Sequence, residues 1–372
     1  MNVLALVTDA YGGRGGVAAV NRMILRAVAE RSDVEAVRVV PRLHTGGVDP
    51  PPPAVSVDES AAEGKGAYVR AVLGAARSSR WDVVLCGHLH LLPLAALVPA
   101  PTVLVAHGID VWRPGADGPG TVGPAKAALL RPLIARAQVV VAVSEFTLGR
   151  FARWAGPLGR NAVVVPNGVP DDQFSPGPAP PGLASRYGLD DRTVLMTLCR
   201  LASAEGYKGV DEVLESLPAI RARVPDVAYL VCGDGDDRPR LEAKARALGL
   251  GGVVAFAGYV PEAEKADHYR LADAFVMPSR GEGFGVVYLE ALASGVPVVA
   301  GTSDGSREAL RDGALGVLVD PRSPDDLVRG VLRALSRPPG VPEGFNHFSE
   351  ARFHQRWSAV IDRALAGGGP GR

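Results

Sequence analysis

The feature that most restricts the fold is an alternation of short β-branched runs with longer amphipathic runs, which occurs twice along the chain. This alternation is typical of βα units that build a parallel sheet. The first series ends near residue 165 and the second begins near residue 194. Residues 166–182 lie between them and contain six prolines, which favour neither a helix nor a central strand. The sequence therefore predicts an α/β protein with two tandem doubly wound parallel-sheet domains.

The domain boundaries follow from the same pattern. We predict an N-terminal Rossmann-like domain over residues 1–170, a Pro/Gly-rich hinge over 171–185 and a C-terminal Rossmann-like domain over 186–345. The length of 372 residues and an apolar content of 47% suit two such cores. The expected strands are Val3–Val7, Ala36–Val40, Val83–Cys86, Val103–Ala106, Val139–Val143, Ala162–Val165, Val194–Leu198, Ala228–Cys232, Val253–Ala257, Ala274–Met277, Val296–Ala300 and Gly316–Val319.

Charge and cysteine content exclude some classes of protein. Forty Lys and Arg balance forty Asp and Glu, which disfavours a generally basic nucleic-acid binder. Residues 1–170 carry 17 basic and 12 acidic side chains, so this half suits an anionic acceptor or an anionic lipid surface, although chance explains the excess equally well. Three cysteines far apart predict a cytoplasmic chain without a disulfide framework. No apolar run approaches the ~20 residues of a membrane span.

A glycine-rich loop, Gly12–Gly16, follows the first strand and precedes the first helix. Glycines permit close approach of a ligand, and the amides of a helix start favour an anion. The loose Gly-x-Gly pattern also raises the alternative of a dinucleotide-dependent oxidoreductase. The second strand ends in Val40-Pro41-Arg42, where an NAD site would need an acidic residue. A plain tight turn remains the other interpretation.

Ligands of doubly wound sheets bind at the carboxyl ends of the strands, where further polar residues stand. His107 follows the strand Val103–Ala106 and is able to donate to a hydroxyl or to stabilise developing charge, unless it only caps a turn. His88 and His90 also follow a strand, but without a nearby carboxylate or cysteine they make a poor metal site.

Two cations follow the first strand of the second series. Arg200 stands just after Leu198, and Lys208 precedes the next helix. Together they are able to clamp a diphosphate and to neutralise a departing one. The alternative is a surface arginine and a lysine at a helix end.

Two glutamates bracket a glycine-containing helix start in the segment Glu282–Glu290. Gly283 and Gly285 permit close approach, and the helix start favours phosphate. Glu290 falls within an apolar run and therefore needs a partner, because an unpaired buried charge costs several kcal/mol. Two ribose hydroxyls would serve.

With these residues in place, the chain resembles the retaining glycosyltransferases of family 4, which have the GT-B fold. The most specific part of the resemblance is the Glu-x7-Glu element from Glu282 to Glu290. The cations Arg200 and Lys208, the PNGV at 166–169, the VSEFT at 143–147 and the glycine-rich first loop also match. The sequence departs from the family pattern at Cys199, where glycine is common, and in the turn 304–308, where a Gly-Gly-x-x-Glu turn is usual.

The resemblance implies a role for each of these residues. His107, Arg200, Lys208 and Glu282 would be catalytic, with the two cations on the leaving diphosphate and Glu282 on the donor sugar. Glu290 would bind the ribose hydroxyls, and Tyr259 with Val260 would touch the base. The residues implied in donor binding are Gly15, Gly16, Asn167, Gly233, Tyr259, Val260, Phe284, Gly285, Val286 and Glu290.

The resemblance also implies a reaction. A hexose-type sugar would move from a UDP- or GDP-sugar to a glycan, lipid or small molecule, with retention and without a metal or any other cofactor. The helix at 349–365 would pack back on the first domain. The alternatives are a nucleotide-sugar epimerase or phosphorylase of the same fold, and an inactive binding subunit of a glycan-assembly complex. Peripheral contact with the inner face of an anionic membrane is a further expectation, based on the basic helix Pro124–Ala137.

Overall fold

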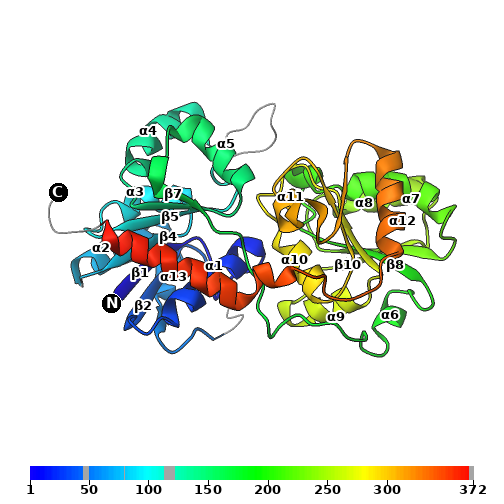
Figure 1. The fold of residues 1–372 in the computed structure, drawn as a ribbon, viewed down its shortest axis with the longest axis horizontal. Helices are drawn as coiled ribbons and strands as arrows, with labels where there is room; N and C mark the ends of the chain where they lie inside the picture. The colour runs from blue at the N-terminus through cyan, green and yellow to red at the C-terminus, as the bar shows by residue number, and fades with distance from the viewer. Residues whose placement is uncertain (45–49, 79, 113–121, 368–372) are drawn as a thin grey trace. The chain divides into compact units, whose positions relative to one another are not determined.

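The structure is a computed structural model that describes residues 1–372 except 45–49, 79, 113–121 and 368–372 (Figure 1). The described chain divides into two compact units. Unit 1 comprises Met1–Gly168 together with Glu350–Arg372, and unit 2 comprises Val169–Ser349. Between β7 and α6, residues 165–182 form neither helix nor strand.

Unit 1 contains a parallel sheet with the strand order β3-β2-β1-β4-β5-β6-β7. β1 pairs with β2 and with β4, so the chain leaves the centre first in one direction and then in the other. β1, β4, β5 and β6 are apolar and almost completely buried, as expected for strands covered on both faces. The strands are β1 Asn2–Val7, β2 Ala36–Pro41, β3 Val55–Val57, β4 Val83–Cys86, β5 Thr102–Ala106, β6 Val139–Ala142 and β7 Ala162–Val164.

Helices cover both faces of this sheet. One face carries a hydrophobic core that includes Leu4 of β1, Val72 of α2, Leu130 of α4 and Phe151 of α5. α1 and the C-terminal helix α13 pack against each other, and α13 also contacts β4, β5 and β6. The helices are α1 Gly16–Ala29, α2 Lys65–Ser78, α3 Leu92–Ala95, α4 Pro124–Ile134, α5 Glu145–Ala155 and α13 Glu350–Ala366, with the 3₁₀ helices η1 Glu59–Glu63, η2 Leu89–Leu91 and η3 Gly159–Asn161.

The helix α13 belongs to unit 1 although it follows unit 2 in the sequence (Figure 1). Phe353, Trp357 and Ile361 recur every four residues and are at most 1% exposed, which is the stripe of a helix packed on a sheet. Arg31 at the end of α1 donates to Ser358 O at 2.9 Å and pairs with Asp362 at 2.7 Å. α13 is therefore held by an apolar stripe and by polar contacts at its edge.

Unit 2 contains a parallel sheet with the order β10-β9-β8-β11-β12-β13. Its strands are β8 Thr193–Leu198, β9 Val227–Cys232, β10 Val254–Gly258, β11 Ala274–Met277, β12 Val298–Gly301 and β13 Val317–Val319. Its helices are α6 Leu183–Arg186, α7 Val210–Arg221, α8 Arg238–Ala247, α9 Lys265–Arg270, α10 Val286–Ala293, α11 Ser306–Ala309 and α12 Pro324–Leu335, with the 3₁₀ helices η4 Ser203–Lys208, η5 Glu262–Glu264, η6 Arg311–Gly313 and η7 Phe345–Phe348.

The sequence predicts every strand except β3. This strand contains only three residues, Val55–Val57, and follows three consecutive prolines. It pairs with the outer side of β2, so it forms because β2 offers a free edge rather than because its own pattern is strong. The composition of the Pro/Gly-rich segment 46–53 predicts a loop, and the part of this segment within 45–49 lies outside the described residues.

Candidate functional site

The strand order of unit 2 has its switch point between β8 and β11. From β8 the chain runs outward to β9 and β10, and it then returns to β11 and continues outward to β13. The segments that follow β8 and β11 therefore diverge at the carboxyl edge of the sheet, where doubly wound folds bind ligands. Arg200 and Lys208 lie after β8, and Glu282 lies after β11.

These three side chains meet in one charged cluster. Lys208 Nζ pairs with Glu282 Oε1, and Lys208 Nζ lies 3.9 Å from Glu205 Oε2. Glu205 Oε1 in turn pairs with Arg200 Nη2. Burial is the largest single influence on Lys208 and would lower its pKa, but the combined effect of its neighbours, chiefly the carboxylate of Glu282, outweighs burial. The pKa is therefore raised and the amine keeps its charge. The structure thus brings together the predicted cations and Glu282, with Glu205 between them.

Glycines of the loop after β9 support the segment that carries Arg200. A Cβ on Gly233 would lie 1.8 Å from Cys199 O, and its φ is +135°. A Cβ on Gly235 would lie 2.1 Å from Leu201 O, and Leu201 N donates to Asp234 O at 3.0 Å. Only glycine permits this approach of two backbones. The predicted donor residue Gly233 therefore supports the loop of Arg200 through close backbone packing against Cys199.

The loop after β11 is joined to η4. Arg280 N donates to Tyr207 O at 2.9 Å, and a Cβ on Gly281 would meet the Tyr207 ring at 2.7 Å. Gly209, with a φ of +90°, is the N-cap of α7, and a Cβ there would lie 2.7 Å from Pro278 O. The backbone on either side of the Lys208–Glu282 pair is therefore closely packed.

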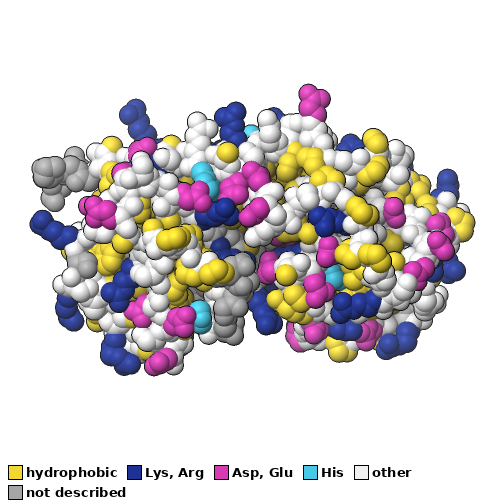
Figure 2. All heavy atoms as spheres, turned by 90° about the horizontal axis from the view of Figure 1, so that it is seen from below, with side chains coloured by type: hydrophobic (Ala, Val, Ile, Leu, Met, Phe, Trp, Pro, Cys, Tyr) yellow, Lys and Arg dark blue, Asp and Glu magenta, His cyan; other side chains and the backbone are white. Residues whose placement is uncertain are grey.

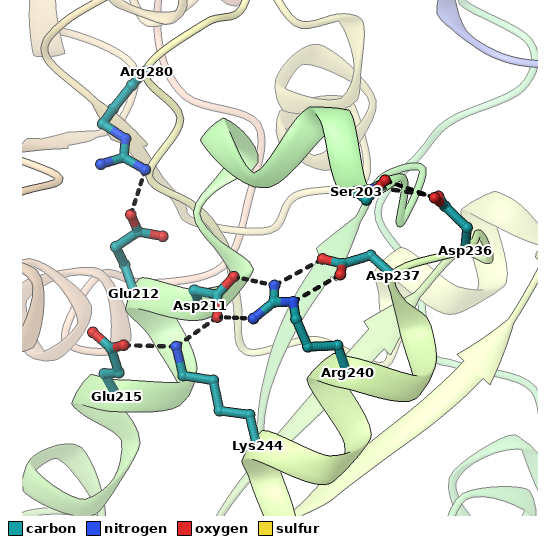
Figure 3. Close-up of polar contacts among 9 residues, drawn as sticks. All are labelled: Ser203, Asp211, Glu212, Glu215, Asp236, Asp237, Arg240, Lys244 and Arg280. Atoms are coloured by element: carbon teal, nitrogen blue, oxygen red, sulfur yellow. Dashed lines mark hydrogen bonds and ion pairs between the residues drawn. The ribbon is translucent and has the colours of Figure 1, made fainter.

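A network of ion pairs lies behind the cluster (Figure 3). Figure 3 shows Arg240 of α8 between Asp211 of α7 and Asp237, with N–O distances of 2.6 and 2.7 Å, and Lys244 beside it on Asp211. The hydrogen bonds from Arg240, with help from Lys244, lower the pKa of Asp211 to about 2 against the opposing effect of burial.

Two further contacts tie the loops of the site to this network. Ser203 of η4 donates its amide and its hydroxyl to Asp236, at 3.0 and 2.6 Å. Arg280 pairs with Glu212 of α7 at 2.7 Å. The starts of α7 and α8 and the two loops of the site are thus held in one frame.

Asp304 holds the backbone of Glu282. One carboxylate oxygen accepts the Glu282 amide at 2.7 Å, and the other accepts the Ser306 amide at 3.0 Å and its hydroxyl. Asp304 is 3% exposed, and burial raises its pKa to about 6. The turn 304–308, in which the sequence departs from the family pattern, therefore supplies a buried carboxylate that positions Glu282.

Helix α10 carries the second glutamate of the pair. Gly285, with a φ of +88°, is its N-cap, so Val286 begins the helix and its amide belongs to the open first turn. Glu290 is 4% exposed; Tyr269 OH donates to it at 2.8 Å and Lys265 Nζ lies 3.4 Å away, both from α9. The burial expected for Glu290 is observed, and the protein itself supplies a cation and a hydroxyl as partners.

Two further predicted donor residues end up in different surroundings. Phe284 is 1% exposed and packs edge-on against Phe348, with ring centroids 5.7 Å apart, so its side chain belongs to the core and only its backbone is left for a ligand. Tyr259, which follows β10, is 45% exposed, and the neighbouring Val260 is buried. The Tyr259 ring lies at the carboxyl edge of the sheet, as base contact requires.

Four of the predicted site residues lie in unit 1, namely Gly15, Gly16, His107 and Asn167. Their neighbour in the first loop, Gly13, has a packing role, because a Cβ there would fall 1.7 Å from the carboxylate of Asp9. Gly15 and Gly16 are exposed, and a Cβ on either would meet nothing within 4 Å. They leave the first turn of α1 open, as binding of an anion requires. Asn167 is 5% exposed and lies close to the end of this unit's first segment.

His107 joins the ends of β5 and β4. Its Nε2 lies 3.1 Å from Gly87 O, and its amide and that of Gly108 donate to Asp110 at 3.1 and 2.7 Å. Burial lowers the pKa of His107 and outweighs the opposing effect of Asp110. Since a carbonyl only accepts, Nε2 carries the proton of the neutral ring and Nδ1 keeps a lone pair. In this tautomer Nδ1 accepts a hydrogen bond rather than donating one.

The comparisons with known proteins agree with this geometry. A family model described as Glycosyltransferase Family 4 matches residues 14–173, and one described as Glycosyl transferases group 1 matches residues 192–351. The chain belongs to glycosyltransferase family 4. Among curated relatives, it is 38% identical over 254 residues to the GDP-mannose-dependent alpha-(1-6)-phosphatidylinositol monomannoside mannosyltransferase of Mycolicibacterium smegmatis. That match covers 66% of this chain and 65% of the relative.

Another family 4 relative is the phosphatidyl-myo-inositol mannosyltransferase of the same organism, 35% identical over 62% of this chain and 57% of the relative. Solved structures share the GT-B fold. Anabaena HepE, solved with UDP and glucose, has a TM-score of 0.75 and 20% identity over 97% of this chain and 99% of that one. Sucrose-phosphate synthase from Thermosynechococcus elongatus has a TM-score of 0.73 and 18% identity over 98% and 97%. These neighbours show the fold of this family 4 chain.

Among the described residues, no helix has both the length and the apolar character of a membrane span. In the same part of the chain, no three His, Cys, Asp or Glu side chains are grouped as metal ligands.

The sequence pattern did not identify four residues that shape the site. Glu205 lies between the two cations, and Asp304 holds the amide of Glu282. Lys265 and Tyr269 are the partners of the Glu290 carboxylate. The one available signal was Asp304 itself, because it stands where the family pattern has glycine.

Proposed function

We propose that the chain is a retaining glycosyltransferase that moves a hexose-type sugar from a nucleoside-diphosphate sugar to an acceptor hydroxyl. The observation that carries the proposal is the meeting of Arg200, Lys208 and Glu282 at the switch point of unit 2 in a family 4 chain. Two cations at that edge suit the negative charge that develops on a leaving diphosphate.

In the proposed reaction, the bond between C1 of the sugar and the diphosphate oxygen breaks and a bond from the acceptor oxygen to C1 forms on the same face. The acceptor proton passes to an oxygen of the leaving diphosphate. Arg200 and Lys208 stabilise that group, so no metal is required, and the remaining contribution is positioning. Glu282, whose amide is held by Asp304, contacts the donor sugar.

GDP-mannose is the donor that we propose to test first. The curated relatives at 36–38% identity are named as GDP-mannose-dependent enzymes, whereas HepE, solved with UDP-glucose, is 19% identical. Several of the relatives' names contain inositol, as in phosphatidylinositol monomannoside and inositol 3-phosphate. An inositol-bearing acceptor is therefore the first class to test beside glycans and lipids.

Thermal shift with GDP, UDP, ADP, dTDP and NAD tests the donor class, because a ligand that binds only the folded state raises its stability. We expect a shift with GDP or UDP and none with NAD. Turnover is then measured with the matching sugar donor. Arg200→Ala and Lys208→Ala should each lower it by orders of magnitude, whereas Arg329→Ala, an exposed ion-paired arginine of α12, should not.

Near-normal turnover in both site variants would reject the diphosphate role. Epimerisation of the donor without transfer would favour the epimerase alternative, and cleavage that requires inorganic phosphate would favour the phosphorylase alternative. Tight nucleotide binding without turnover would favour a binding subunit.

Membrane contact is a separate part of the proposal. Leu130 and Ile134 of α4 are buried, while Leu129 is 67% exposed and Lys126 is half-buried nearby on the same helix. The face drawn in Figure 2 carries basic and acidic side chains interspersed, so that face offers no field of one sign to an anionic lipid. Flotation with phosphatidylglycerol vesicles, compared between the native chain and Leu129→Ser, tests it, and equal flotation would reject the role of α4.

A further inference from the structure

The cations proposed to bind the diphosphate are already occupied by carboxylates. Arg200 pairs with Glu205, and Lys208 pairs with Glu282 and lies 3.9 Å from Glu205. Two positive and two negative side chains leave the cluster with no formal charge. A diphosphate that enters this cluster unchanged meets a neutral site instead of a cationic one, which removes the electrostatic reason for binding there.

The position of Glu205 in the fold is fixed by its backbone. Its amide donates to Ala202 O at 2.8 Å, and its φ and ψ of −115° and 23° interrupt η4. Asp236 holds Ser203 at one end of η4, and Gly209 packs against Pro278 at the other. The Glu205 side chain is 10% exposed, whereas that of Arg200 is 72% exposed. The carboxylate is therefore directed into the site by a supported backbone and does not reach it by chance from a surface loop.

The space around the cations is filled by this side chain. Arg200, Glu205, Lys208 and Asp211 line a hollow of about 10 Å³. That volume holds about one water molecule. A phosphate group needs more room, so a position between Arg200 and Lys208 requires the Glu205 carboxylate to move.

Of the two carboxylates, Glu205 has the more exposed partner. Lys208 and Glu282, which pair with each other, have side chains that are each 16% exposed. Arg200, the partner of Glu205, is 72% exposed, so its guanidinium is able to turn from Glu205 to an anion in solvent.

We propose that Glu205 is a stand-in for the donor's diphosphate: its carboxylate takes the anion position on Arg200, yields it when the donor binds and competes for it again when the nucleoside diphosphate leaves. This inference rests on the proposed function and adds a residue that sets affinity and product release. It predicts an effect of unusual sign, because removal of a residue that contacts a binding residue strengthens binding.

Calorimetry with GDP and UDP on the full chain tests the inference. Glu205→Gln should bind the preferred nucleoside diphosphate about two- to fivefold more tightly than the native chain, the range expected for the loss of one partly exposed ion pair. Product inhibition should strengthen to the same degree. The gain should shrink in an Arg200→Ala background, because Glu205 acts mainly through that side chain. Glu215→Gln is the matched control: it removes the same charge from α7, at an exposed site paired with Lys244, and should leave affinity unchanged.

The outcomes separate the inference from the function on which it rests. Unchanged or weaker binding by a folded Glu205→Gln variant, with native binding intact, would overturn the stand-in role and make Glu205 a support for Arg200. An equal gain in Glu215→Gln would overturn it too, since the effect would then be one of net charge. Absence of binding by both the native chain and Glu205→Gln would reject the proposed function and the inference together, while binding by the variant alone would support the inference strongly. Thermal unfolding of each variant establishes that it is folded.

Discussion

The buried pair of Lys265 and Glu290 allows a prediction whose size follows from the structure. The two side chains are 8% and 5% exposed, and their charged atoms lie 3.4 Å apart. Lys265→Met removes the cation but keeps an apolar stem of similar length. Glu290 then keeps the Tyr269 hydroxyl as a partner, but its charge is no longer balanced inside the protein. Breaking a buried pair in this way costs about 3–5 kcal/mol.

Protonation of the stranded carboxylate sets a ceiling on this loss. Holding a glutamate neutral costs about 1.4 kcal/mol for each pH unit above its ordinary pKa of about 4.3. The ceiling is therefore about 4 kcal/mol at pH 7 and about 1 kcal/mol at pH 5. In the variant the folded state binds the extra proton, so stability decreases as the pH rises.

Urea unfolding at pH 5 and pH 7 measures both values. The four tryptophans, Trp81, Trp112, Trp154 and Trp357, all belong to unit 1, so their fluorescence follows that unit. Far-UV circular dichroism follows both units. We expect the dichroism transition to shift to lower urea while the fluorescence transition moves less.

Two further variants make this prediction decisive. The double variant Lys265→Met/Glu290→Gln replaces the charged pair by a neutral one and should recover most of the stability and lose the pH dependence. Glu262 is the other carboxylate near Lys265, and its side chain is 19% exposed. Glu262→Gln should therefore cost less than about 1 kcal/mol. A loss below about 1 kcal/mol at pH 7, or an equal loss at both pH values, would refute the reasoning.

Three other predictions follow from the geometry. Gly233→Ala places a Cβ 1.8 Å from Cys199 O and should weaken nucleoside diphosphate binding at least about tenfold by displacing the loop of Arg200; calorimetry that finds native affinity would contradict this. Burial raises the pKa of Asp304 to about 6, so its protonation stabilises the folded state by up to about 3 kcal/mol; this stabilisation is complete below about pH 4 and is lost as the pH rises through about 6. Urea midpoints measured against pH should show a slope in this range that Asp304→Asn lacks, and equal slopes in the two proteins would count against the prediction. Arg31→Ala removes the contacts with Ser358 and Asp362 and should speed amide hydrogen exchange in α13 about tenfold. Mass spectrometry measures this exchange with α7 as the internal reference, and unchanged exchange would mean that the apolar stripe alone holds α13.

The alternation of runs predicted the sheets well because each central strand is a continuous apolar segment that needs no partner to be recognised. The same alternation did not predict β3, because three residues are too few to show a pattern and only pairing with the free edge of β2 makes them a strand. The meeting of Arg200, Lys208 and Glu282 was also accessible, since the ends of neighbouring parallel strands must lie at one edge.

The partners of these residues were less accessible. Glu205 faces Arg200 only because η4 is a 3₁₀ segment with an interruption, which no simple periodicity encodes. Lys265 reaches Glu290 across 25 positions through the packing of α9 on α10, a contact that depends on the finished core. The sequence therefore indicated where a buried carboxylate lies more readily than what neutralises it.

The position of α13 has a consequence for the order in which the chain folds during synthesis. Unit 2 is a single continuous stretch, Val169–Ser349, and its contacts are complete once that stretch has left the ribosome. Unit 1 is different, because α1 and β4–β6 complete their packing only with α13, a helix that is made more than 180 residues after β7. Until α13 emerges, the apolar surface that will receive Phe353, Trp357 and Ile361 stays uncovered. The segment translated first is thus the last to finish folding, and a nascent chain stalled before residue 350 should present one complete domain and one that still requires protection from aggregation.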